Sequence, residues 1–217
     1  MKKETLFVVA AVGLLIVLLF GTLAYMSSRK TQPVQPVERN RENLVRLHSP
    51  ALGRADAPVV IVEFLDPACG TCREFYPFVK QMMAANPEKI RLVLRYAPFH
   101  QGSDQVVAML EAARRQGKFW PALEALLASQ PEWVLNHKAR ADLAWKPLEG
   151  LGLNFEQMRA DMKSPETARV IAQDLDDVRV LEVTQTPEFF VNGRPLPSFG
   201  YEQLKALVDK ALASAAR

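Results

Sequence analysis

The chain has 217 residues, of which 49% are hydrophobic and 24% are charged, and its formal net charge is +3. This length suits one globular domain with an appendage. The basic residues are scattered along the chain, which argues against a nucleic-acid-binding protein. Two cysteines are too few for a disulfide-rich scaffold, and a chain of this length does not need one.

A long apolar segment lies close to the N-terminus. Residues 6–26 carry no charge, and as a helix they would span about 30 Å, the thickness of a bilayer core. The apolar core of a cleaved signal peptide is usually only about 7–15 residues long and precedes a small-residue cleavage site. We therefore expect residues 1–26 to form an uncleaved signal anchor, with a cleaved signal peptide as the alternative. Basic residues flank the segment on both sides, so the positive-inside rule does not decide its orientation.

A polar stretch separates this segment from the rest of the chain. Residues 27–49 include two successive Gln-Pro-Val triplets, and proline at this spacing favours an extended backbone. We expect residues 27–49 to be a linker and residues 50–217 to form the folded domain.

The first part of this domain has the pattern of a βαβ unit. Val59–Leu65 is an apolar, β-branched run typical of a buried strand. Residues 71–85 have apolar side chains at helical spacing, and Ile90–Tyr96 is predicted to be a second strand with alternating side chains. A strand, a helix and a strand within about 40 residues predict a parallel pair with a right-handed crossover.

A helical block is predicted from about residue 103 to residue 182. Ser103, Asn154 and Ser164 are suitable N-cap residues for three of its helices. Phe119–Ala128 is predicted to be a short amphipathic helix. The three tryptophans of the block are expected to pack in its core, and they are Trp120, Trp133 and Trp145.

The last part of the chain is predicted to be a β-hairpin followed by a helix. Glu188–Val191 precedes Asn192-Gly193, and this dipeptide between apolar runs is a strong hairpin signal. Pro195 confines the returning strand to the edge of a sheet. Tyr201–Ala215 is predicted to be the closing helix.

Cys69 and Cys72 are the only cysteines, and they follow the first predicted strand where the helix begins. Free N–H groups and the positive end of the helix dipole favour a thiolate there, as in activated cysteines with pKa values of roughly 3.5–7.5. Cys72 is three residues further on, so it lies on the same helix face within bridging reach. We expect an exposed, nucleophilic Cys69 and a deeper Cys72 that resolves mixed disulfides.

Other interpretations of the cysteine pair are weaker. A structural disulfide would close a loop too short to restrain the unfolded chain much. A zinc site would need two more ligands, and His48, His100 and His137 show no paired spacing. A Cys-x-x-Cys sequence between the strand and helix of a βαβ unit instead indicates a thioredoxin-type redox motif.

Residues 50–217 resemble the thioredoxin-fold thiol-disulfide oxidoreductases, and most closely the DsbA-like group. The resemblance rests on the strand that leads into Cys-Gly-Thr-Cys, on Thr186-Pro187 followed by EFFVNG, and on the helical insertion over residues 103–182. It implies an α/β thioredoxin fold with this insertion between the βαβ unit and the C-terminal hairpin and helix, in addition to the N-terminal transmembrane helix. Gly70-Thr71 departs from the Pro-His dipeptide of the best-known DsbA proteins, so their strong oxidising power does not carry over.

The resemblance also implies roles for residues outside the motif. Thr186 and Pro187 would form a cis-proline loop that binds extended client segments beside the cysteines. Glu63, on an otherwise apolar strand, would assist proton transfer near the buried cysteine, and the alternative is a solvated side chain that faces outwards. Asp66 is a second candidate for this role, and His100 is expected to be structural.

The predicted function is dithiol–disulfide exchange with client proteins that contain thiols or disulfides, and a redox partner would reset the cysteine pair. Neither a metal nor an organic cofactor is expected, and oxidase, isomerase and reductase would share this site. The resemblance implies a catalytic domain in the bacterial periplasm, held at the inner membrane by the N-terminal helix. Two alternatives stay open: a membrane-tethered chaperone or binding module with a redox-switch cysteine pair, and a copper-handling dithiol protein.

Overall fold

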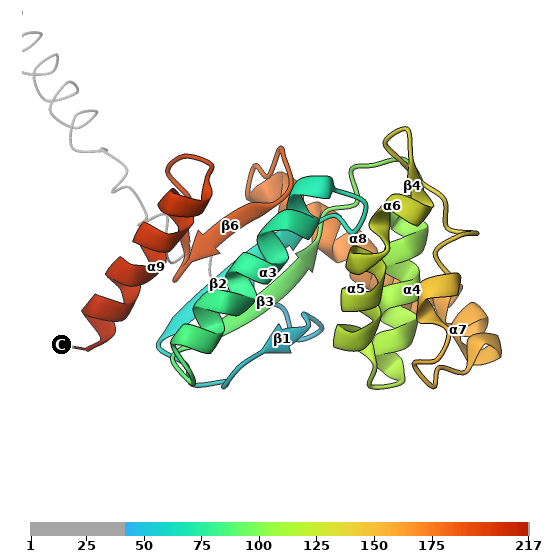
Figure 1. Cartoon of the computed structure of the whole chain (residues 1–217), viewed down its shortest axis with the longest axis horizontal. Helices are drawn as coiled ribbons and strands as arrows, with labels where there is room; N and C mark the ends of the chain where they lie inside the picture. Colours follow the sequence, from blue (N-terminus) through green and yellow to red (C-terminus); the bar gives the residue numbers. More distant parts are fainter. Residues whose placement is uncertain (1–41, 217) are drawn as a thin grey trace, which may run out of the picture. The chain divides into compact units, whose positions relative to one another are not determined.

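The structure, a computed structural model, describes residues 42–216 (Figure 1). The predicted signal anchor, residues 1–26, and the first part of the predicted linker lie outside this range. Among the helices within residues 42–216, none combines the length and the hydrophobicity that a membrane-spanning helix requires.

A five-stranded sheet in the order β1-β3-β2-β6-β7 forms the centre of the domain. Its strand β2 (Val59–Leu65) runs parallel to β3 (Ile90–Tyr96), and helix α3 (Gly70–Ala85) connects the two. The predicted βαβ unit is therefore confirmed. On its other side, β2 pairs antiparallel with β6 (Glu188–Val191).

The two edge strands are short. β1 (Ala51–Leu52) pairs antiparallel with β3, and β7 (Arg194–Pro195) pairs antiparallel with β6. Asn192 and Gly193 join β6 to β7 with φ angles of 48° and 82°, which a tight hairpin turn requires. The predicted hairpin is confirmed, and Pro195 lies on an edge strand, where a missing N–H group is tolerated.

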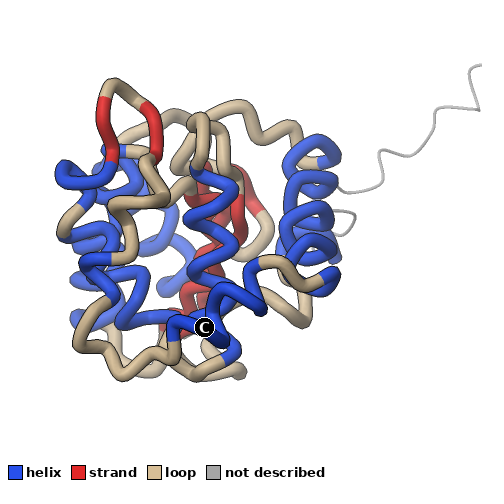
Figure 2. Tube along the Cα trace, turned by 90° about the vertical axis from the view of Figure 1, so that its right-hand side faces the viewer, coloured by secondary structure: helices blue, strands red, loops and turns tan. Residues whose placement is uncertain are grey.

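Helices cover both faces of the sheet (Figures 1 and 2). On one face, α3 and α9 (Tyr201–Ala215) pack against side chains of β2 such as Ile61. On the other face, α8 (Pro165–Val180) packs in an apolar cluster that includes Phe64. The side chains of β3 alternate between the two faces as predicted, with Leu92 and Leu94 in one apolar cluster and Val93 in the other. Because both faces are covered, residues 92–96 are all buried.

The region between β3 and β6 is largely helical, as predicted. Trp133 is fully buried in it, and Trp120 and Trp145 pack partly buried against the core. A small hairpin of β4 (Val134–Leu135) and β5 (Lys138–Ala139) was not predicted. The helices before α8 are α4 (Ser103–Arg115), α5 (Phe119–Ala128), α6 (Gln130–Trp133), the 3-10 helix η1 (Lys146–Leu148) and α7 (Phe155–Met162).

Two of the three predicted N-caps are confirmed. The side chains of Asn154 and Ser164 each accept a hydrogen bond from the backbone N–H three residues further on. Ser103 is instead the first residue of α4, and its hydroxyl donates a hydrogen bond to the buried Asp66. Ser103 therefore connects the helical block to the loop that leads to the cysteines.

The folded domain begins before residue 50. Leu44 is 1% exposed and lies in the apolar cluster between the sheet and α8. Arg46 Nη2 lies 2.6 Å from the Asp177 carboxylate, and His48 Nε2 lies 2.6 Å from that of Asp174. Residues 43–49, which the sequence assigned to the linker, are thus packed on the domain.

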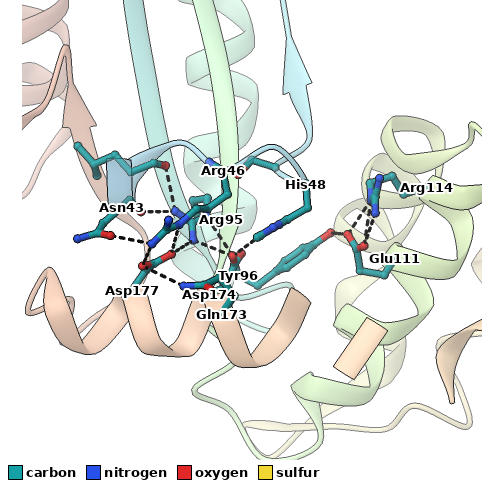
Figure 3. Close-up of polar contacts among 12 residues, drawn as sticks. Asn43, Arg46, His48, Arg95, Tyr96, Glu111, Arg114, Gln173, Asp174 and Asp177 are labelled. Carbon is teal, nitrogen blue, oxygen red and sulfur yellow. Dashed lines mark hydrogen bonds and ion pairs between the residues drawn. The ribbon is translucent and has the colours of Figure 1, made fainter. Parts of the chain in front are cut away.

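A buried arginine organises this contact (Figure 3). Arg95, on β3, is fully buried and donates hydrogen bonds to the carboxylates of Asp174 and Asp177 on α8. It also donates to the backbone oxygens of Asn43 and Leu44. Buried charges are tolerated when they are paired and hydrogen-bonded, and this cluster meets both conditions while joining three segments of the chain.

Replacement of Arg95 by leucine should destabilise the domain strongly. The substitution leaves the Asp174 and Asp177 carboxylates buried without their shared cation, and we expect the free energy of unfolding to fall by about 3–5 kcal/mol. Urea unfolding measures this change. The matched control is Arg54→Leu, because Arg54 pairs with Asp56 at the surface, where the two side chains are 54% and 69% exposed. Equal shifts of the urea midpoint in both variants would contradict the assigned role of Arg95.

Candidate active site

Cys69 occupies the N-cap position of α3, which begins at Gly70. The loop after β2 turns tightly, since the Cys69 N–H donates to the Asp66 carbonyl oxygen at 3.0 Å. The strand thus delivers Cys69 to the helix end where backbone N–H groups are free. Cys69 is only 6% exposed, less than the sequence suggested, and Cys72 is fully buried.

The surroundings of Cys69 stabilise its thiolate. Its pKa is lowered to about 5, chiefly by the hydrogen bond that the Cys72 thiol donates to it. Burial acts in the opposite direction. The side chain of Thr186 and the backbone N–H groups of Thr71 and Cys72 favour the anion further. Cys69 is therefore a thiolate at neutral pH.

Cys72 has the opposite character. Burial raises the pKa of its thiol well above the ordinary value. The hydrogen bond that it donates to Cys69 and the negative charges of Glu63 and Cys69 raise the pKa further. At neutral pH the pair therefore consists of a thiolate beside a thiol, as a nucleophile and a resolving cysteine require.

Glu63 points to the face of β2 that α3 covers, because side chains alternate along a strand and Ile61 and Leu65 pack with Cys72 on that face. Glu63 is fully buried, and its two carboxyl oxygens have no hydrogen-bond partner within residues 42–216. Burial raises its pKa to about 8, and the negative charge of Cys69 contributes to the shift. The alternative of a solvated Glu63 is thus wrong, and the carboxyl group is electrostatically coupled to both cysteines.

The loop that contains Thr186 and Pro187 lies against Cys69. The peptide bond between them is cis, as the resemblance implies. Glu188, the first residue of β6, pairs with Phe64 near the C-terminal end of β2. This pairing holds the Thr186–Pro187 loop at the same end of the sheet as Cys69. In its thiol form, Cys69 Sγ donates a hydrogen bond to the Thr186 carbonyl oxygen at 3.2 Å.

The Asp66 carboxylate is occupied by the neighbouring loops. It accepts hydrogen bonds from the backbone N–H of Ala68 at 2.8 Å and from the Ser103 hydroxyl. It also accepts hydrogen bonds from the backbone N–H groups of Phe99 and His100 in the loop after β3, each at 2.8 Å. One of its oxygens lies 2.7 Å from His100 Nδ1. Asp66 and His100 therefore hold the loop before Cys69 in place.

Sequence reasoning missed Gln130, on α6. This side chain is 3% exposed, and its Nε2 donates to the carbonyl oxygens of Pro67 at 2.8 Å and Cys69 at 3.0 Å. The helical insertion thus fixes the backbone of the turn that carries Cys69. A single glutamine in a helical block has no distinctive pattern, so only the fold reveals its position.

Comparison with known proteins agrees with this geometry. The sequence model described as thioredoxin matches residues 46–210. The chain belongs to the thioredoxin family. A solved structure of a thioredoxin-like oxidoreductase from Silicibacter pomeroyi superposes with a TM-score of 0.69 and 32% identity, over 80% of this chain and 98% of that one. The mixed α/β thioredoxin-like fold expected from the sequence is thus confirmed.

Three further proteins are also similar to this chain. The thiol-disulfide exchange protein α-DsbA2 from Wolbachia pipientis shares the fold, with a TM-score of 0.66 and 20% identity over 81% of this chain and 93% of that one. The probable disulfide bond formation protein D from Bacillus cereus is 27% identical over 97% of both chains. The Na(+)/H(+) antiporter NhaA 3 from Salinispora tropica is 33% identical over 83% of this chain. The matched part of this chain spans only about a quarter of the length of that antiporter.

The cause of the low Cys69 pKa in this thioredoxin-family site can be tested by alkylation. We expect the rate of iodoacetamide reaction with Cys69 to titrate with a midpoint near pH 5. Cys72→Ala removes the thiol that donates to Cys69 and should raise the midpoint, whereas Cys72→Ser keeps a hydroxyl donor and should raise it less. The two variants lack the same sulfur, so equal midpoints would contradict the role of the hydrogen bond.

The buried Glu63 should make stability depend on pH. With a pKa of about 8 when folded and about 4.3 when unfolded, Glu63 binds more protons in the folded state between these values. Its contribution to the free energy of unfolding therefore falls as pH rises through this range. We expect Glu63→Gln to match the wild type at about pH 4 and below and to be more stable by roughly 5 kcal/mol above pH 8.

Urea unfolding of the reduced wild type and of Glu63→Gln at several pH values measures this difference. The lowered pKa of Cys69 contributes in the opposite direction, because that contribution grows as pH rises above about 5. Both proteins contain Cys69, so subtraction largely removes its effect. A difference that stays constant with pH would show that Glu63 does not carry the raised pKa.

Proposed function

We propose that the protein is a dithiol–disulfide oxidoreductase that exchanges disulfides with client proteins through Cys69 and Cys72. The observation that carries this proposal is the opposite ionisation of the two neighbouring thiols, with the pKa of Cys69 lowered to about 5 and that of Cys72 raised. A stabilised thiolate attacks and leaves readily, and its protonated neighbour does not compete with it. The names of the similar oxidoreductase and disulfide bond formation protein support the same reaction.

In the oxidising direction, a client thiolate attacks Cys69 in the Cys69–Cys72 disulfide. The client–Cys69 bond forms, the Cys69–Cys72 bond breaks, and Cys72 leaves as a thiolate that takes up a proton. A second client thiolate then attacks the client sulfur of the mixed disulfide, and Cys69 leaves as a thiolate. Two electrons pass from the client to the cysteine pair, and a separate redox partner of the disulfide class removes them.

We assign the proton transfer at Cys72 to Glu63. The unpaired, buried carboxyl group is coupled to Cys72 and holds its proton at neutral pH, since burial raises its pKa to about 8. It therefore has a proton to give when Cys72 leaves as a thiolate, and the carboxylate regains one when Cys72 has to attack. Asp66 does not fit this role, because its oxygens are occupied by the loop contacts.

The stabilised Cys69 thiolate favours oxidation of the client, with reduction of the Cys69–Cys72 disulfide. Stabilising Cys69 as an anion stabilises the reduced pair relative to the disulfide. A pKa of about 5 lies between values of about 7 for thioredoxin and about 3.5 for DsbA. We therefore expect a reduction potential between those of the two proteins, about −270 mV and about −120 mV.

We propose that the Thr186–Pro187 loop binds the client backbone. When Cys69 is protonated, the carbonyl oxygen of Thr186 accepts a hydrogen bond from its thiol. When Cys69 is a thiolate, it has no proton to donate to this oxygen. An N–H group of an extended client segment can then bond to this oxygen beside the nucleophile, in the manner of an added strand.

We also propose that the domain works in the bacterial periplasm and is held at the inner membrane by residues 1–26. Their uncharged stretch, residues 6–26, is long enough to span a bilayer as a helix. Protein disulfides form and persist in oxidising compartments such as the periplasm, so this location suits the proposed reaction.

The reaction can be tested with the oxidised protein and a reduced, unfolded client. We expect the wild type to transfer its disulfide to the client, Cys69→Ser to transfer none, and Cys72→Ser to accumulate a mixed disulfide with the client through Cys69. Non-reducing gels and mass spectrometry identify the products. Equilibration of the wild type with glutathione buffers gives the reduction potential.

The variants also separate exchange from simple client binding. A chaperone or binding module would retain its effect on client aggregation in Cys69→Ser, and the wild type would leave client thiols unchanged. That pattern would overturn the proposed reaction. A potential at or below that of thioredoxin would overturn the oxidising direction and leave the exchange itself intact.

A further inference from the structure

We propose that a basic pocket beside Cys69 binds an acidic side chain of the client, next to the client's reactive cysteine. This inference rests on the proposed function and concerns the selection of clients. The pocket has a volume of about 440 Å³ and lies between the start of α3, the segment around α6 and the β4–β5 hairpin. Ala68 and Gly70, the two chain neighbours of Cys69, line it, so it opens directly beside the nucleophile.

The polar lining of this pocket carries the positive charge of Arg73, while the Gln130 amide N–H groups are used by the Pro67 and Cys69 carbonyl oxygens. None of the described residues that line it is acidic, and its polar members are Arg73, His100, Gln130, Asn136 and His137. Asp66 lies behind His100, but it is fully buried and hydrogen-bonded to the loops. The positive end of the α3 dipole adds to the attraction for an anion. A carboxylate is therefore the side-chain group that this lining fits.

Arg73 is the residue that we assign to the client carboxylate. It lies in the first turn of α3, and its backbone N–H donates to the carbonyl oxygen of the N-cap residue Cys69 at 3.2 Å. A guanidinium binds a carboxylate through two parallel hydrogen bonds. Among the acidic side chains of residues 42–216, Arg73 pairs only with Glu74, at a long 3.9 Å, and the two side chains are 36% and 60% exposed. Such a surface pair is weak, so Glu74 does not block the site.

The β4–β5 hairpin provides a preformed wall for the pocket. Asn136 and His137 join its strands with φ angles of 52° and 60°, and positive φ at both central residues is typical of the tightest hairpin turns. The hairpin is fixed to the loop after β3, because the Ala139 N–H donates to the Gln101 carbonyl oxygen at 2.9 Å. A wall that is already ordered lowers the entropic cost of binding.

The arrangement of the elements makes the pocket reachable for a client that is bound at Cys69. In Figure 1, β6 and α6 lie on opposite sides of the N-terminal end of α3. The Thr186 loop precedes β6 and contacts Cys69 from that side, and the pocket lies on the side of α6. A client segment that pairs with Thr186 and crosses Cys69 therefore continues towards Arg73.

The test uses three peptides that differ only in the residue after a single cysteine, which is Asp, Asn or Lys. The rate constant for the reaction of each reduced peptide with the oxidised full chain is measured with detergent present. The proteins are the wild type, Arg73→Gln, Arg73→Glu and Lys80→Gln. Lys80 is the matched control, because it lies on α3 and carries the same charge, but about 16 Å along the helix from Cys69. Comparing the Asp/Asn rate ratio between proteins cancels the intrinsic reactivity of each peptide thiol.

We expect Arg73→Gln to lower the Asp/Asn ratio about two- to fivefold, as for a partly exposed ion pair. Arg73→Glu should make the Lys peptide react faster than the Asp peptide, and Lys80→Gln should leave the ratio at its wild-type value. An unchanged ratio in Arg73→Gln, or an equal fall in Lys80→Gln, overturns the pocket. In either case the exchange function stands if the peptides react, whereas a failure of all three peptides to react overturns both proposals.

Discussion

The chemistry of the Cys69 site depends on one constraint, which is that the buried site stabilises only one negative charge. Cys69, Cys72 and Glu63 are all acids, all are buried, and each is coupled to the others. In a poorly solvated site, one negative charge opposes the ionisation of its neighbours. Hydrogen bonds from Cys72 and from the start of α3 place the single charge on Cys69, and Cys72 and Glu63 consequently keep their protons.

In the proposed reaction, the same coupling lets bond formation at Cys69 prepare Cys72. When Cys69 enters a disulfide its charge disappears, and with it one cause of the raised pKa values of Glu63 and Cys72. Removal of a proton from these two groups then costs less, at the step where Cys72 has to attack or leave as a thiolate. The proton belongs to a coupled pair rather than to either residue alone. Hydrogen-bond partners of its own would bias a carboxyl group towards one ionisation state, so the absence of partners within residues 42–216 supports the proposed proton-transfer role of Glu63.

Local patterns predicted the parts of this fold that local forces form. The apolar run Val59–Leu65 and the turn Asn192-Gly193 each specify their own structure, and the strand-to-helix junction places Cys69 at an N-cap. Long-range contacts decided the rest. Ser103 has the pattern of a cap, but the buried Asp66 competes for its hydroxyl, and Gln130 reaches the cysteine turn only because the insertion folds back. The raised pKa of Glu63 depends on burial by several elements, which no single segment encodes.

The first described segment of the chain packs on the side of the sheet that lies opposite to the cysteines. Leu44 packs in the apolar cluster on the sheet face opposite to α3, and Arg46 and His48 fix the same segment to α8. Cys69 and Cys72 belong to the cluster on the α3 face. Residues 43–49 therefore lie on the face away from the cysteines, and the buried Arg95, which bonds to the backbone of residues 43 and 44, holds them there. The ion cluster thus fixes this segment to α8 on the sheet face opposite to the one on which Cys69 and Cys72 pack.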